Sequence, residues 1–399
     1  MEKESAQKYP KGFRASGISC GIKKGRKKDL ALIFSETQCA AAGFYTKNKF
    51  AAAPVEVCRW HLENNQSRAI LVNSGCANAC TGKKGIDNAV KTAKYAAKAL
   101  RCPLKDVLVA STGVIGQHLP VDKLRKGIPR GAKALKNTGW MDAAKAIMTT
   151  DTVPKITSID MEIQGKTVTF LGIAKGSGMI HPDMATMLAF VVSDIDVSAP
   201  ALRKAAKHAV NHSFNRVTVD GDTSTNDTVL FLANGMAGNK TITPRRQDYR
   251  IFETVLTEVC QILARKIARD GEGATRLIEV NVKGARSVRD AEKTADAVAG
   301  SNLVKTAIFG RDANWGRIVC AIGYSEAEFD PDKITVHIGP ELVFSGGAPK
   351  IKDEKGVNRV LEREEIPIHI DLKAGDKEAT VWSCDFSYDY VKINADYRT

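Results

Sequence analysis

Residues 175–190, KGSGMIHPDMATMLAF, join a loop rich in glycine to a run of apolar residues. The glycines and the proline of the first part are typical of exposed, turning backbone. The apolar residues from Met187 onward are typical of a buried strand. Thr186 therefore stands where a loop enters the core. A threonine at such a junction is usually the first residue of a strand, and it can also be a nucleophile that cuts its own chain.

Outward from this stretch, apolar runs of strand length alternate with segments of helical periodicity. We expect strands at residues 30–34, 69–73, 107–111, 168–174, 277–282, 335–338 and 368–372. We expect helices at residues 88–100, 141–148, 200–211 and 252–268. Residues 112–116, TGVIG, are expected to form a turn, and residues 217–227 a loop rich in Asp and Thr. This mixture predicts an α/β protein of large sheets with helices packed outside them.

The chain of 399 residues carries a formal net charge of +14. Its basic clusters, residues 23–28 and 123–136, contain no interleaved aromatic residues and match no nucleic-acid-binding motif. We therefore expect no nucleic-acid partner, and we expect the charge to attract small carboxylates. No apolar run approaches the roughly 18 residues of a membrane span. The first eight residues carry acids and lack an apolar core, so we expect no membrane contact and a cytoplasmic protein.

Nine cysteines are scattered along the chain without any CxxC pair. The odd number and this spacing argue against a disulfide framework and against a zinc ribbon. Cys76 and Cys80 form the only close pair, and no histidine stands near them in the sequence. We expect buried thiols in a reducing compartment and no metal.

A threonine hydroxyl needs a base before it can act as a nucleophile. His181 and Asp183 stand in the same short loop as Thr186, where a triad would not easily reach its geometry, so we assign His181 to the turn. The other possible base is the α-amine of Thr186 itself, freed by cleavage of the Ala185–Thr186 bond. The usual pKa of an α-amine, about 7.7–8.0, suits a general base near neutral pH.

Three further sites have both a structural and a chemical interpretation. Thr112 and Gly113 could donate hydrogen bonds to an oxyanion, or form a plain strand-to-helix turn. Lys175 could hold an anionic group, or be solvated. Glu272, flanked by glycines, could receive an ammonium group, or belong to a loop that ends a helix. The residues alone leave these alternatives open.

The chain resembles the glutamate N-acetyltransferase family of arginine biosynthesis, also called the ornithine acetyltransferase family. The resemblance rests on many long motifs that follow one another in a fixed order. The resemblance runs from residue 11 to the end of the chain. The motifs are residues 11–15, 28–33, 73–82, 111–116, 149–152, 175–190, 218–227, 270–275, 312–318 and 390–399.

The resemblance implies self-cleavage between Ala185 and Thr186 into an α chain, residues 1–185, and a β chain, residues 186–399. It makes Thr186 the nucleophile, and Thr112 with Gly113 the oxyanion hole. The substrate contacts that it implies are Thr152, Lys175, Thr186, Glu272, Asn394 and Thr399. It also implies an α-β-β-α sandwich, like that of other self-processing amidohydrolases, in which the two chains are intertwined.

The activity implied is a ping-pong transfer of acetyl from N2-acetylornithine to glutamate through an acetyl-Thr186 ester. No metal or bound cofactor is implied, and acetyl-CoA serves some relatives as a further donor. The implied assembly is an α2β2 heterotetramer. Two alternatives remain: a self-processing aminopeptidase or amidohydrolase in which water replaces glutamate, and a basic binding protein whose Ala185–Thr186 bond is never cut.

Overall fold

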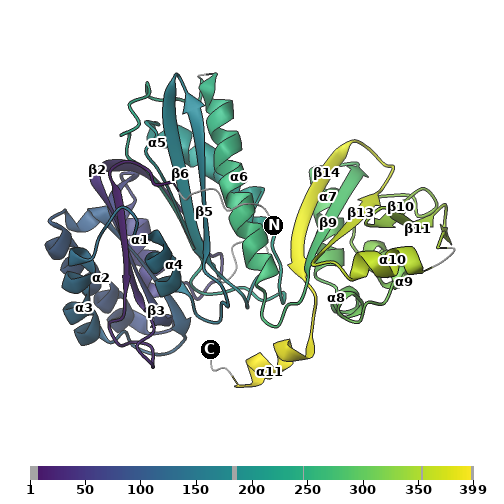
Figure 1. Ribbon diagram of the computed structural model, residues 1–399, viewed down its shortest axis with the longest axis horizontal. Coiled ribbons are helices and arrows are strands. Elements are labelled where there is room, and N and C mark those ends of the chain that lie inside the picture. The colour runs from purple at the N-terminus through teal and green to yellow at the C-terminus, as the bar shows by residue number, and fades with distance from the viewer. Residues whose placement is uncertain (1–7, 182–186, 246, 352–353, 397–399) are drawn as a thin grey trace.

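Two β-sheets organise the computed structural model, which describes residues 8–181, 187–245, 247–351 and 354–396 (Figure 1). The first is an eight-stranded sheet with the order β4-β3-β2-β8-β7-β6-β5, in which β1 also pairs with β2. The second is six-stranded, with the order β12-β11-β10-β13-β9-β14.

The first sheet bends at its longest strand, β2 (Leu30–Tyr45). The first half of β2 pairs with β1 (Phe13–Ile18) and with β3 (Gln66–Cys76), whereas its last residues pair with β8 (Thr228–Ala233). The register with β3 shifts between Phe34 and Cys39, within the strand. One long strand therefore belongs to both halves of the sheet.

The remaining strands complete each half. β4 (Val107–Val114) runs parallel to β3. On the other side, β8 is followed by β7 (Leu188–Ser193), β6 (Lys166–Lys175) and β5 (Lys155–Ile163). Because β6 pairs with β7, the chain before residue 182 and the chain after residue 186 are hydrogen-bonded in one sheet.

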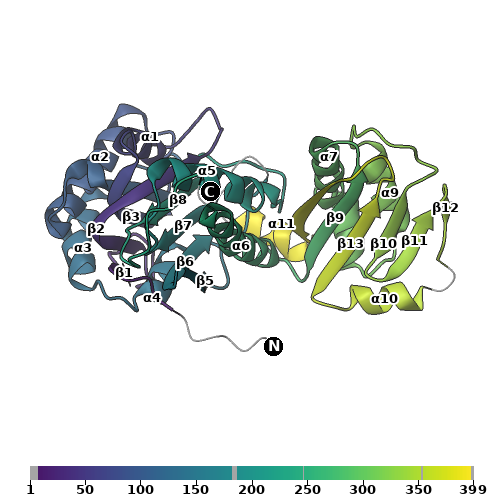
Figure 2. The same ribbon diagram turned by 90° about the horizontal axis from the view of Figure 1, so that it is seen from above.

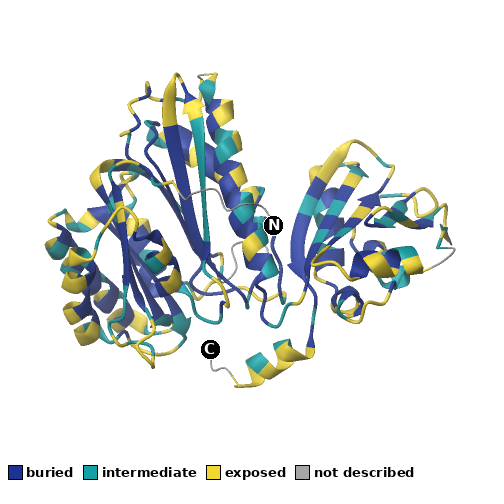
Figure 3. Cartoon of the chain, viewed as in Figure 1, coloured by how far each residue is buried: buried dark blue, intermediate teal, exposed yellow. Residues whose placement is uncertain are grey.

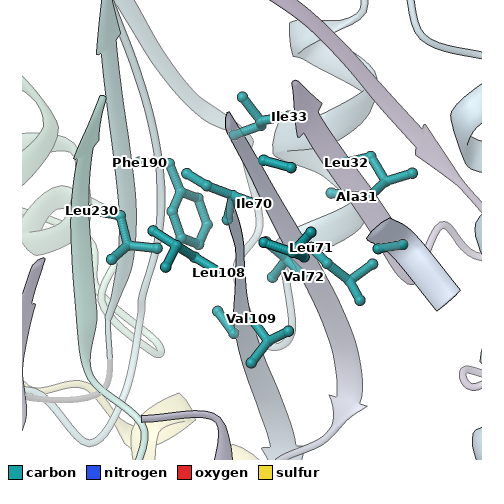
Figure 4. Packing of buried hydrophobic residues seen from close by; sticks show 14 of the residues in the cluster. Ala31, Leu32, Ile33, Ile70, Leu71, Val72, Leu108, Val109, Phe190 and Leu230 are labelled. Carbon is teal, nitrogen blue, oxygen red and sulfur yellow. The ribbon is translucent and has the colours of Figure 1, made fainter. Parts of the chain in front are cut away.

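Alternate residues of β7 face different layers, as the two-residue repeat of a strand requires. Phe190 packs in one core with Ile70 and Leu108, and Leu230 of β8 lies beside it (Figure 4). Val191 packs in another core, with residues of α5 (Ala199–Asn211) and α6 (Asp248–Arg269). Burial of one side chain such as Phe190 contributes about 1.5–3 kcal/mol. The two halves of the sheet therefore pack face to face.

Helices cover the outer faces of both halves. In Figure 1, α2 (Gly82–Leu100) and α3 (Val121–Lys133) lie on the left and α6 lies near the middle of the picture, with strands of the first sheet between them. The expected α-β-β-α sandwich is confirmed. Shorter elements of this unit are α1 (Ala53–His61), η1 (Leu104–Asp106), α4 (Trp140–Ile147) and η2 (Phe214–Arg216).

The second sheet forms a unit with its own core. Ile278, Val280 and Val282 alternate along β9 and pack with the helices of this unit. Its strands are β9 (Leu277–Ala285), β10 (Thr335–Ile338), β11 (Glu341–Ser345), β12 (Ala348–Pro349), β13 (Glu365–Asp371) and β14 (Lys377–Cys384). Its helices are α7 (Val288–Ala299), α8 (Asn302–Phe309), α9 (Trp315–Gly323) and α10 (Lys355–Leu361).

The last helix, α11 (Tyr388–Asp396), leaves the second unit and lies between the two units in Figure 2. None of its residues is buried, as the exposed colours of Figure 3 show. It contacts both units: Tyr388 stacks edge-on against Phe309, and Tyr390 donates a hydrogen bond to Asp220. This helix brings the end of the chain to the sandwich.

The expected elements lie within observed ones or differ from them by a residue at an end, and one local expectation was wrong. Thr112 and Gly113 belong to β4 and not to a turn, because the parallel pairing with β3 continues through them. The basic residues 123–133 form most of α3, whose buried Leu124 and Ile128 hold it against the sheet. Among the described helices, none combines the length and the apolar character that a bilayer crossing requires.

Candidate active site

A cavity of about 250 Å3 opens where the sandwich meets α11. The end of β4, the end of β6, the loop of residues 217–227 and the segment after α6 supply its walls. It brings together most of the described residues that the sequence singled out: Thr112, Gly113, Lys175, Glu272 and Asn394. Ala185, Thr186 and Thr399 lie outside the described residues, so their roles stay predictions.

Gly113 stands where β4 passes closest to β3. Its φ is +127°, in a region that residues with a side chain rarely adopt. A Cβ placed there would lie 2.4 Å from the carbonyl carbon of Gly75. Glycine is therefore needed for β4 to pass so close to β3, and Gly113 itself lines the cavity.

Lys175 is the last residue of β6, and only 2% of its surface is exposed. Its ammonium Nζ donates a hydrogen bond to Thr112 Oγ1 at 3.3 Å. Burial lowers the pKa of Lys175, against the attraction of Asp151. A buried cation is therefore held against the proposed oxyanion residue.

A buried ion triad lies behind Lys175. The Nζ of Lys155, whose side chain is fully buried, lies 2.7 Å from Asp151 Oδ1 and 2.6 Å from Asp270 Oδ2. Burial alone would raise the pKa of Asp151, but the charges of Lys155 and Lys175 lower it to about 2. Asp151 also accepts the N–H of Gly176 at 2.7 Å. The triad thereby fixes the backbone next to Lys175.

Thr152 does not join the cavity lining. Its N–H donates to Asp270 Oδ2 at 3.1 Å, and its hydroxyl donates to the same carboxylate. The residue is exposed and borders a separate hollow with Val153 and Pro154. Its neighbours Thr149 and Thr150 line the cavity instead.

Glu272 enters the cavity across Gly178. Its Oε2 accepts a hydrogen bond from Asn394 Nδ2 at 2.8 Å, and its N–H donates to Ser177 O at 2.8 Å. A Cβ on Gly178 would lie 2.3 Å from the Glu272 carboxyl carbon. The carboxylate therefore occupies space that any larger residue at 178 would take.

The loop of residues 217–227 contributes more than its sequence indicated. Asp220 accepts the N–H groups of Met179 and Ile180 at 2.5 and 2.8 Å, and burial raises its pKa. Asn226 Nδ2 donates to Ala77 O at 2.7 Å and to Ser111 O at 2.9 Å. The sequence motifs give no individual role to Asp220 or Asn226. The density of Asp, Thr and Asn in residues 217–227 was the signal that could have found them.

Asp227 lies beside the residue that follows Thr186. Its Oδ1 accepts the N–H of Met187 at 2.9 Å. Its Oδ2 is buried and has no hydrogen-bond partner in the described part of the chain. Burial raises the pKa of Asp227 well above its usual range. An uncharged carboxyl group is therefore favoured next to the start of the expected β chain.

His181 lies outside this cavity. Its Nδ1 is 3.5 Å from Thr218 Oγ1, and the residue borders a hollow with Lys47 and Thr223. In residues 8–181, 187–245, 247–351 and 354–396, no group of three or more His, Cys, Asp or Glu side chains is arranged to hold a metal ion.

A family model described as the ArgJ family matches residues 14–399. The chain is 53% identical over 392 residues to the arginine biosynthesis bifunctional protein ArgJ of Symbiobacterium thermophilum, covering 98% of each chain. It is 51% identical over 394 residues to the protein of that name from Caldanaerobacter subterraneus, again covering 98% of each. A crystal structure of ArgJ from Bacillus halodurans is 45% identical, with a TM-score of 0.51, and the match covers 52% of this chain and 98% of that one. These findings confirm the resemblance seen in the motifs.

Proposed function

The chain belongs to the ArgJ family, and on this basis we propose that it moves an acetyl group from N2-acetylornithine to glutamate. One observation carries the proposal: Thr112, Gly113, Lys175, Glu272 and Asn394 line a single cavity. The ArgJ relatives carry arginine biosynthesis in their names, which supports these substrates.

The reaction begins with self-cleavage of the Ala185–Thr186 bond, which frees the α-amine of Thr186. That amine takes the hydroxyl proton while Oγ attacks the acetyl carbonyl. Hydrogen bonds from Thr112 and Gly113 stabilise the oxyanion. The C–N bond then breaks, the proton passes to the departing amine, and ornithine leaves an acetyl-Thr186 ester. The amine of glutamate attacks this ester, and N-acetylglutamate leaves with Thr186 regenerated.

Charge in the cavity suits both amino acids. Lys175 can attract the carboxylate that ornithine and glutamate share, and Glu272 can receive an ammonium group. Thr399 is a further proposed substrate contact, whereas Thr152 lies outside the cavity and donates its hydroxyl to Asp270. No metal or bound cofactor takes part in this scheme.

The deciding experiment is a product assay of the purified protein. We expect N-acetylglutamate from N2-acetylornithine plus glutamate. A second reaction, with acetyl-CoA plus glutamate, tests the further donor that we propose because the relatives are named bifunctional. If acetylornithine were cleaved to acetate without glutamate as fast as it is cleaved with glutamate, the protein would be a hydrolase and not a transferase.

We also propose a cytoplasmic α2β2 assembly of the cleaved chains. The segments before and after residues 182–186 pair in one sheet, which supports the association of one α chain with one β chain within this assembly. Light scattering of the cleaved protein measures the mass of the assembly. The summed mass of two α and two β chains supports the proposal, and the summed mass of one α and one β chain rejects it.

Gly178→Ala is expected to raise the KM for acetylornithine about 10- to 100-fold with little change in kcat. The added methyl group would occupy the position of the Glu272 carboxylate and turn it away from the cavity. Loss of one charge-assisted contact costs about 1.5–3 kcal/mol, and 1.4 kcal/mol is a factor of ten.

The matched control is Gly323→Ala in α9, where an added Cβ meets nothing within 4 Å. Its KM should equal that of the unmodified enzyme. Equal kinetics of the two variants would show that Glu272 does not bind substrate from this position.

A further inference from the structure

The ammonium of Lys175 and the hydroxyl of Thr112 meet at the cavity wall. Their Nζ–Oγ1 distance is 3.3 Å, and both residues are buried. A lysine ammonium has donors only, so the Thr112 oxygen must be the acceptor. The Thr112 proton therefore points away from Lys175.

Nothing in the described part of the chain accepts that proton. The only side-chain hydrogen bond of Thr112 there is the one that it receives from Lys175, and Thr112 lines the cavity. A hydroxyl that accepts from a cation becomes a stronger donor, because hydrogen bonds in a chain polarise one another. The cavity thus contains a polarised O–H group whose natural partner is a negatively charged oxygen.

We infer that Lys175 is a positioning residue of the oxyanion hole and acts through Thr112. Its Nζ donates to Thr112 Oγ1, and the Thr112 hydroxyl donates to the oxygen that becomes negative as the acetyl carbonyl is attacked. This inference rests on the proposed acetyl transfer and adds a second task to Lys175 besides attracting a carboxylate.

The surroundings of Lys175 fit this task. Burial and the charge of Lys155 lower the pKa of Lys175, whereas the charges of Asp151 and Glu272 raise it and favour the ammonium form. The N–H of Gly176, the next residue, is fixed by Asp151. The backbone beside Lys175 is therefore anchored, which favours one position of its ammonium group against Thr112.

A double-mutant cycle separates this arrangement from two independent contacts. The variants are Thr112→Val, Lys175→Met and the double variant, each measured for kcat at saturating acetylornithine and glutamate. Saturation removes the effect of Lys175 on substrate binding, which appears in KM. We expect Thr112→Val to lower kcat about 10²–10³-fold, as for other oxyanion donors.

Lys175→Met is expected to lower kcat at least about tenfold when Thr112 is present, and less than about threefold when it is absent. Effects that multiply in the double variant would overturn the inference. Thr112→Ser keeps a hydroxyl, so Lys175→Met should again cost about tenfold in that background. A loss there as small as in the valine background would contradict the relay.

Self-cleavage also passes through an oxyanion, so its rate is a second readout. Loss of the 43.2 kDa chain on a denaturing gel should follow the same non-additive pattern. Lys175→Gln replaces Lys175→Met if thermal unfolding shows that the methionine variant is not folded. Failure of the proposed function is distinguishable, because the unmodified enzyme would then make no N-acetylglutamate.

Discussion

Thr186→Ala protein is expected to remain a single chain of 43.2 kDa and to form no detectable N-acetylglutamate. Alanine has no hydroxyl to attack the preceding carbonyl or the acetyl group, so one substitution removes both reactions. Loss of a nucleophile of this type lowers kcat by about 10⁶. A denaturing gel and the product assay measure the two consequences on the same sample.

Thr186→Ser is the matched control, because it retains the hydroxyl and, after cleavage, the α-amine. Cleavage should proceed in this variant, at a rate that the gel follows over hours. If Thr186→Ala protein were cut and active, the nucleophile would be another residue. If the serine variant stayed intact while folded, the hydroxyl alone would not explain cleavage.

Lys155→Met is expected to lower the free energy of unfolding by about 3–5 kcal/mol. The substitution leaves the carboxylates of Asp151 and Asp270 buried without their shared cation. It also removes the cation that holds Asp151, the acceptor of the Gly176 N–H, so we expect transfer activity to fall as well. Urea unfolding followed by circular dichroism gives the change in stability.

Lys305→Met is the control for this variant. Lys305 is equally buried, but its Nζ donates to neutral groups, Ser383 Oγ at 3.0 Å and Cys384 O at 2.6 Å. Its loss should cost about 1–3 kcal/mol, the cost of unsatisfied neutral acceptors. An equal cost in both variants would mean that charge pairing adds nothing at Lys155. The triple variant with Asp151→Asn and Asp270→Asn should regain part of the loss.

Large sheets with helices packed outside them could be predicted because the strands are nearly continuous apolar runs and the helices have clear periodicity. The α-β-β-α layering followed from the family resemblance. The extent of β2 could not, since polar residues 36–38 interrupt the apolar run while the backbone continues as a strand. The assignment of Thr112 and Gly113 to a turn failed for a similar reason. Their strand conformation depends on β3, which lies about forty residues earlier, and small residues give no local signal for such pairing.

The site residues could be proposed because motifs in a fixed order identified a family. The structure then separates neighbours that the sequence treats alike. Thr149, Thr150 and Thr152 share one short motif, yet only the first two line the cavity. The difference arises from Asp270, which binds Thr152 from 118 residues away. Such long-range partners also explain why the Asp151–Lys155–Asp270 triad was not anticipated.

The pairing of β6 with β7 has a consequence for the lifetime of the mature protein. Scission within residues 182–186 would nick a sheet whose neighbouring strands continue to hold each other. The two fragments would stay together as long as the sheet stays folded, but unfolding would let them diffuse apart. Refolding would then require the two fragments to associate, so its rate would depend on their concentration. The uncut chain would refold as a single molecule. The lifetime of the nicked protein would instead be set by how slowly it unfolds.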